Sequence, residues 1–133
     1  MALQTEAMVT SRSETARLRI IPKISLSVIF AQAGAIKPLP AGTAIAFNTS
    51  SNGYVEWATG GANGTGTVQG LIFPDPVTVT TAGEVAGVVM FSGEAHRDDV
   101  QSDGGTAAQL TTALLKTMAQ GLVIRNMIDM RPL

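Results

Sequence analysis

The residues that could do chemistry are few, and most lie in one short stretch. His96 is the only histidine, and Asp98, Asp99 and Asp103 follow it closely. A histidine beside carboxylates can act as a general base or, together with them, bind a metal ion. However, the chain has no Gly-x-Ser-x-Gly elbow for a serine triad and no calcium-loop spacing. We therefore interpret the segment between Phe91 and the next helix as a hydrophilic loop, with acidic residues placed ahead of the helix start.

A second stretch, Gly60-Gly61-Ala62-Asn63-Gly64-Thr65-Gly66, has the glycine content of a phosphate-binding loop. It lacks the Lys-Ser/Thr pair of a P-loop, and the spacing of Gly64, Gly66 and Gly70 misses the dinucleotide fingerprint by one residue. The chain has no cysteine, which excludes thiol catalysis and cysteine-ligated metals. The sequence therefore predicts no catalytic residues, no cofactor and no metal.

The composition is that of one globular domain with unusually few charges. The 133 residues are 45% hydrophobic but only 14% charged, against roughly 25% in an average soluble domain. Either much of the surface is buried in an assembly, or neutral polar side chains cover it. The net charge of −1 does not fit a uniformly basic nucleic-acid binder. No stretch approaches the roughly 20 apolar residues of a membrane span.

The few charges are unevenly distributed along the chain. Residues 1–37 carry five basic and two acidic groups, whereas the segment from Pro38 to His96 has four acidic groups and no lysine or arginine. A basic segment ahead of an acidic body can fold back on that body or on a neighbouring copy, or reach an external acidic partner. It can also be a solvated terminus.

The hydrophobic pattern predicts a mainly β fold of the α+β class. Residues 1–16 show no sustained period, and a two-residue alternation starts at Arg17. Residues 1–23 are predicted to form an extended arm, flexible or ordered by a partner, and residues 24–133 a single β-rich domain. Ile24, Leu26, Val28 and Phe30 alternate with serines, which is typical of a half-buried strand. Further strands are expected at 43–47, 54–57, 68–73, 77–81, 85–91 and 122–130. The ring of either Tyr54 or Trp57 should pack inward.

One segment is predicted to be helical, close to the C-terminal end. Thr106-Ala107-Ala108-Gln109 has the form of a capping box, in which the threonine and glutamine side chains satisfy free N–H groups. Gly121 stands where a left-handed C-terminal cap would fall. The expected apolar face consists of Leu110, Leu114 and Met118, with Ala107 and Leu115 beside them.

Several motifs, in order along the chain, resemble the lambda-type bacteriophage head decoration proteins. The matching stretches are Ala31–Lys37 with Gly42–Ala46; Tyr54-Val55-Glu56-Trp57 with the glycine-rich loop and Val68–Ile72; Val88–Ala95 with Arg97-Asp98-Asp99-Val100; and the helix Ala107–Gln120 with Gly121–Arg125. The similarity covers about residues 25–125. The motif positions we single out are Gly42, Thr43, Trp57, Gly93, Glu94, Asp98 and Gly121.

The resemblance implies a homotrimer that binds the outside of the expanded phage head at three-fold positions. There it would clamp neighbouring subunits of the major capsid protein against the pressure of packaged DNA. The activity would be mechanical, with no catalysis, no cofactor, and no direct contact with nucleic acid or membrane. The protein would assemble in the host cytoplasm and reside on the outer surface of the virion.

The same resemblance implies that the N-terminal arm adds a strand to the capsid protein. The candidate contacts are Arg12, Arg17, Leu18, Arg19 and Ile20, and the last four alternate basic and apolar residues as an added strand would. Ordering such an arm costs entropy, so it should pair only where an exposed edge is offered. The long arm and the tail 126–133 depart from the family pattern.

Two other functions remain open from the sequence. A trimeric phage tail or spike domain, or another virion surface module, is the main alternative. A long repetitive or coiled-coil shaft would favour it, and the sequence contains none. The third possibility is a small enzyme or ligand binder that uses His96 with the nearby acids.

Overall fold

The computed structural model describes residues 19–125, and this part of the chain is mainly β with one α-helix. There are also two short 3₁₀ turns. The first, Arg97–Asp99, follows the seventh strand, and the second, Met118–Gln120, follows the α-helix. The other elements are β1 (Ile20–Phe30), β2 (Lys37–Leu39), β3 (Ala44–Asn48), β4 (Gly53–Glu56), β5 (Gly70–Ile72), β6 (Val77–Val79), β7 (Val85–His96), α2 (Ala107–Thr117) and β8 (Leu122–Arg125).

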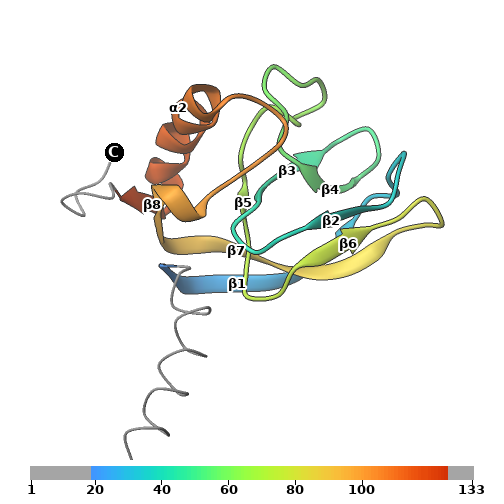
Figure 1. Ribbon diagram of the computed structural model, residues 1–133, viewed down its shortest axis with the longest axis horizontal. Coiled ribbons are helices and arrows are strands. Elements are labelled where there is room, and N and C mark those ends of the chain that lie inside the picture. Colours follow the sequence, from blue (N-terminus) through green and yellow to red (C-terminus); the bar gives the residue numbers. More distant parts are fainter. Residues whose placement is uncertain (1–18, 126–133) are drawn as a thin grey trace, which may run out of the picture.

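Six of the strands form one strongly bent sheet in the order β1-β4-β3-β5-β7-β8. Strand β1 also pairs antiparallel with β7 from Ile20 to Phe30, so that five strands close into a ring. The closing contact with β4 is the single pair Phe30 and Tyr54. Strand β8 runs parallel to β7 beside Gly93–His96. In Figure 1, β7 lies between β1 below it and α2 above it.

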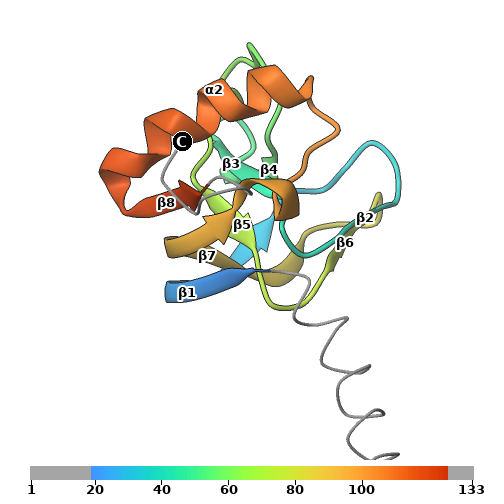
Figure 2. The ribbon, with the colours of Figure 1, turned by 60° about the vertical axis from the view of Figure 1, so that its left-hand side comes forward.

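Both faces of the central strands are buried. One face packs in a core cluster with α2, and the other packs in a cluster with the small two-stranded sheet of β2 and β6. Figure 2 shows α2 lying across one side of the sheet, with β2 and β6 away from it. Neighbouring residues therefore enter opposite clusters: Ala44 and Ile45, Leu71 and Ile72, Met90 and Val89. This two-sided burial explains why these strands are continuously apolar rather than alternating.

The helix confirms the capping box. The Thr106 hydroxyl accepts a hydrogen bond from the Gln109 N–H at 3.2 Å, and Gln109 Oε1 accepts one from the Thr106 N–H at 2.8 Å. Gly121 ends the segment in a left-handed conformation, φ 101°, as predicted. The buried face consists of Leu110, Ala113, Leu114 and Thr117. The expected flanking positions Ala107 and Leu115 are exposed instead, because the buried face lies to the other side of the Leu110–Leu114 row.

Strand β1 differs from the prediction in two respects. It begins at Ile20, so residues 20–23 of the expected arm belong to the sheet, with a register shift at Pro22–Ile24. The prediction that one face of this strand is buried is also wrong, because Ile24 and Leu26 are exposed. The core cluster that contains β2 and β6 includes only Val28 and Phe30 from β1.

Three further differences concern the ends of strands and one additional strand. Strand β7 continues past Phe91 to His96, so the expected hydrophilic loop starts later. Strand β2, three residues long and containing Pro38, was not predicted. Strand β8 is observed to Arg125, and the rest of the expected strand 122–130 lies outside the described residues.

We predict that Gly42→Ala destabilises the fold more than Gly60→Ala. Both glycines have positive φ, 91° and 63°, and a side chain there costs about 1–2 kcal/mol. A Cβ at position 42 would also lie 2.1 Å from the Asp99 carbonyl oxygen, whereas position 60 is open. Displacing that backbone should add about 1–3 kcal/mol. Urea unfolding of both variants measures the difference, and equal losses would contradict the close packing of the Gly42 loop against Asp99.

Candidate association surfaces

The outer edge of β1 is open over most of its length. One edge of the strand pairs with β7 throughout, while on the other edge only Phe30 has a partner among the described residues. An open edge presents unpaired N–H and C=O groups to any extended segment that approaches it. The strand therefore has the backbone chemistry needed to accept another strand.

The side chains of β1 are as unusual as its edge. Four large apolar residues project into solvent: Ile21 (63% exposed), Ile24 (55%), Leu26 (56%) and Ile29 (49%). Lys23 carries the only formal charge of the strand. Soluble domains commonly protect edge strands with charges, proline or a covering element. We call these four side chains, which lie on both faces of the strand, the β1 apolar surface. Exposed apolar side chains that gather on one element are typical of interaction sites.

The start of β1 is held firmly by its own domain. The Arg19 N–H donates to Asp99 Oδ2 at 2.7 Å, and the Arg19 guanidinium forms an ion pair with the same carboxylate at 3.1 Å. Ile20 is 7% exposed and packs in the cluster under α2. Of the five arm residues predicted to contact the capsid, Arg19 and Ile20 thus anchor the strand, and Arg12, Arg17 and Leu18 lie outside the described residues.

The motif positions of the sequence analysis are spread over the fold. Their locations are the β2–β3 loop for Gly42 and Thr43, the end of β4 for Trp57, β7 for Gly93 and Glu94, the following 3₁₀ turn for Asp98, and the helix cap for Gly121. Trp57 confirms the inward-packing ring: it is buried, and its indole N–H donates to the Gly66 carbonyl at 2.9 Å. The Thr43 hydroxyl donates to the Pro40 carbonyl at 2.6 Å. These contacts close loops around the two cores and do not meet in one site.

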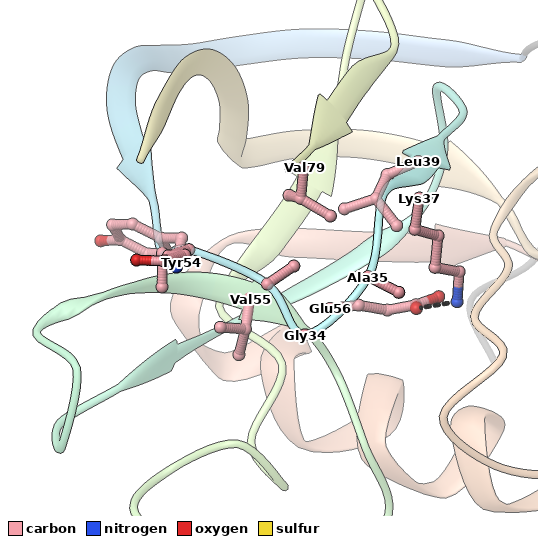
Figure 3. Close-up of a pocket in the computed structure, with 11 residues that line it drawn as sticks. Gly34, Ala35, Lys37, Leu39, Tyr54, Val55, Glu56 and Val79 are labelled. Atoms are coloured by element: carbon pink, nitrogen blue, oxygen red, sulfur yellow. Dashed lines mark hydrogen bonds and ion pairs between the residues drawn. The ribbon is translucent and has the colours of Figure 1, made fainter. Parts of the chain in front are cut away.

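A second surface feature is an apolar cavity of about 280 Å³ between the β1–β2 loop, β4 and β6. Figure 3 shows Tyr54 at one end, with Val55, Leu39 and Val79 along the walls. The Tyr54 ring is fixed by edge contacts with Phe47 and Phe91, at centroid distances of 5.0 and 5.7 Å. The small residues of the loop, Ala31, Ala33, Gly34 and Ala35, leave the cavity open.

The other end of this cavity carries three charged groups. Lys37 Nζ donates to Glu56 Oε1 at 2.5 Å and lies 3.0 Å from the Asp103 carboxylate. Figure 3 marks the Lys37–Glu56 contact. The Glu56 carboxylate also accepts hydrogen bonds from the Ser102 hydroxyl and the Asp103 N–H. The hydrogen bond to Glu56, aided by Asp103, raises the pKa of Lys37 above its ordinary value despite the opposing effect of burial. These charges join β2, β4 and the loop before α2.

The structure does not bring His96, Asp99 and Asp103 together into one group. His96 ends β7 and is 1% exposed, and its Nδ1 accepts a hydrogen bond from the Asp98 backbone N–H at 3.4 Å rather than facing a carboxylate. The three aspartates are spread instead: Asp99 holds Arg19, and Asp103 lies beside Lys37. Within residues 19–125 no three histidine, cysteine or acidic side chains gather as metal ligands would. In the same part of the chain, no helix is long and apolar enough to span a membrane.

A scan against protein-family models, a search of curated proteins and a search of solved structures each found no match to this chain.

We predict that Lys37→Met lowers the free energy of unfolding by up to about 1 kcal/mol at pH 8, because the ion pairs are partly solvated. The pKa of Lys37 is higher in the folded protein. The stabilisation is therefore complete below the unfolded-state pKa of about 10.4 and is lost as the pH rises through the folded-state value.

Urea unfolding of the wild type and of Lys37→Met at pH 8 and pH 11.5 tests this dependence. The Lys116→Met variant, on the exposed side of α2, controls for the general effect of removing a positive charge. A wild-type advantage over Lys37→Met that is as large at pH 11.5 as at pH 8 would contradict the assignment.

Proposed function

We propose that this protein is a head decoration protein of a lambda-type bacteriophage. It forms a homotrimer, binds the outside of the expanded capsid at three-fold positions and stabilises the shell against internal DNA pressure. Residues 1–18 add a strand to the major capsid protein, and the role is mechanical rather than catalytic. The sequence motifs support the family, and the β-rich domain is the kind of body that the family implies.

The observation that carries the proposal is the open, apolar strand directly after the arm. Residues 1–18 lead into Arg19, and β1 then exposes both its outer edge and the β1 apolar surface. Strand addition draws its affinity from main-chain hydrogen bonds and its specificity from side chains on alternate positions. A partner strand that pairs with the arm can continue along the same edge into β1. The arm and β1 thus form one surface for an extended segment of the capsid protein.

The attachment of β1 to its domain suits a clamp. A pull on the arm acts at Arg19, where the ion pair with Asp99 and the buried Ile20 side chain resist it. Beyond that point, the load is shared along the antiparallel ladder between β1 and β7. Three such arms in a trimer would bind one lattice position with multivalent gain. The sparse charge of the body is consistent with extensive contacts between subunits.

We predict that deleting residues 1–18 abolishes binding to expanded heads of the phage that carries this chain and leaves the domain folded. The deletion must stop before Arg19, because Arg19 and Ile20 belong to the folded domain. Light scattering should give about three times the 13.8 kDa chain mass for the intact protein, and three truncated chains for the variant. Co-sedimentation with heads measures binding. A truncated protein that still saturates the heads would overturn the role of the arm.

We also predict that Leu26→Lys weakens binding to expanded heads at least tenfold, about 1.4 kcal/mol. A lysine on an open edge opposes the approach of another strand. Leu26 is exposed, so the free energy of unfolding should change by no more than about 0.5 kcal/mol. The matched control is Leu115→Lys, at an exposed leucine on α2 across the sheet from β1. Equal affinities of the two variants in the co-sedimentation assay would show that β1 does not take part.

A further inference from the structure

The chain contains two Asn-Gly pairs in surface loops, Asn52-Gly53 and Asn63-Gly64. In such a pair the backbone nitrogen of the glycine can attack the side-chain amide of the asparagine, because glycine has no side chain to shield that nitrogen. The two asparagines are closely matched. Both are exposed, both have a left-handed backbone, with φ of 56° and 58°, and neither side-chain amide has a hydrogen-bond partner among residues 19–125. A difference in their reactivity must therefore come from what holds each glycine.

The Gly53 nitrogen belongs to the main sheet. Strand β4 begins at Gly53, which pairs with Asn48 of β3. Hydrogen-bonded and open pairs alternate along an antiparallel ladder. The Trp57 N–H donates to the Ala44 carbonyl at 2.9 Å, so the pair four residues further along the same ladder, Asn48 with Gly53, is of the hydrogen-bonded kind. The nitrogen that would attack Asn52 is thus engaged in strand pairing.

The turn that carries Asn52 is also closed from within. The Asn48 Oδ1 atom accepts hydrogen bonds from the N–H groups of Ser50 and Ser51, at 2.9 and 3.3 Å. Gly53 itself is buried, and a Cβ there would lie 3.1 Å from the Ala31 nitrogen. To bring the Gly53 nitrogen onto the Asn52 side chain, the end of the β3–β4 hairpin must open against its ladder and its packing.

The Gly64 nitrogen has neither restraint. Gly64 lies outside the strands and is exposed, and its N–H has no hydrogen-bond partner within the described part of the chain. The only bonds that hold this pair are on the Asn63 carbonyl, which accepts from the Thr49 N–H at 2.9 Å and from the Thr49 hydroxyl at 3.2 Å. Both join exposed loops, where local opening is easiest. The Gly64 nitrogen can therefore reach the Asn63 side chain without any loss of strand pairing.

We propose that Asn63-Gly64 is a site of spontaneous deamidation, and that the folded domain protects Asn52-Gly53 from the same reaction. The Gly64 nitrogen gives its proton to hydroxide and forms a bond to Asn63 Cγ, while the Cγ–Nδ2 bond breaks and ammonia leaves. Water then opens the resulting succinimide ring at either carbonyl carbon, which yields aspartate or isoaspartate. The net reaction adds one water, releases one ammonia and involves no oxidation.

The modification changes both the charge and the shape of the glycine-rich loop. The new carboxyl group is ionised at neutral pH, since its ordinary pKa is about 3.9. Isoaspartate also lengthens the main chain by one CH₂ beside Gly64, where a Cβ would lie only 2.7 Å from the Phe47 carbonyl oxygen. This loop and α2 line a cavity of about 400 Å³, so the altered wall faces that cavity.

The test is peptide mapping of the full-length protein after incubation at pH 8 in water enriched in oxygen-18. Chymotrypsin cuts after Tyr54 and Trp57, which places the two asparagines in different peptides. Each deamidation during the incubation adds one oxygen-18 atom. In the folded protein Asn63 should convert about tenfold faster than Asn52, or more, because only Asn52 needs the hairpin to open. In urea the two rates should agree within about twofold, because both residues are followed by glycine.

Two results would overturn the proposal. Equal rates at the two asparagines in the folded protein, slow or fast, would mean that the sheet does not decide which pair reacts. A difference that persists unchanged in urea would assign the selectivity to the neighbouring sequence rather than to the fold.

A matched pair of variants checks the assignment on the undigested protein. Asn63→Gly and Asn52→Gly each remove one reactive amide, and glycine tolerates the left-handed backbone at both positions. On ion exchange, the incubated wild type should show a new, more acidic species. Asn52→Gly should form it at the wild-type rate, whereas Asn63→Gly should not. Formation at the wild-type rate in Asn63→Gly would overturn the site. These assays use no phage heads, so their outcome and that of the capsid proposal are independent.

Discussion

Strand β7 is the element on which the rest of the fold depends, because it is paired along both edges. One edge carries the whole of β1, while the other carries β5 near Met90 and then β8 from Gly93. The partner on this second edge changes from β5 to β8 near Gly93, where β1 passes very close to β7. A Cβ at Gly93 would lie 2.4 Å from the Ile21 carbonyl oxygen. A side chain at this position would push β1 away and break the ladder that closes the ring.

This arrangement produces the open edge that we interpret functionally. Since β7 uses both its edges internally, β1 keeps one edge that is open among the described residues except at Phe30. Several of its apolar side chains also face solvent. At the other end of the same ladder, β1 and β8 flank His96 and bring Arg19 and Arg125 to either side of it. An open strand edge and a buried histidine between two arginines are thus two results of one pairing pattern.

Local signals in the sequence predicted where helices and strands lie better than they predicted which of their side chains are buried. The capping box at Thr106 and the cap at Gly121 were predictable because their hydrogen bonds join residues a few positions apart. The alternation of apolar and polar residues located β1. However, the same alternation occurs in strands that pack on their own core and in strands whose apolar side chains stay exposed. The exposure of Leu26 could therefore not be predicted. The anchoring of the arm could not be foreseen either, since the Arg19–Asp99 pair joins residues 80 positions apart. His96 was misplaced in a loop because polar neighbours follow it, although its burial is set by β1 and β8 packing on either side.

The two sides of the core can be followed separately by fluorescence, because each contains a different aromatic fluorophore. Trp57, the only tryptophan, is buried in the cluster under α2, whereas Tyr54, the only tyrosine, packs against the cluster under β2 and β6. Their emission reports on different layers of the same domain. Coincident transitions of the two chromophores during unfolding would mean that both layers melt as one cooperative unit. Separate transitions would mean that one layer can loosen while the other still holds the ring of strands together.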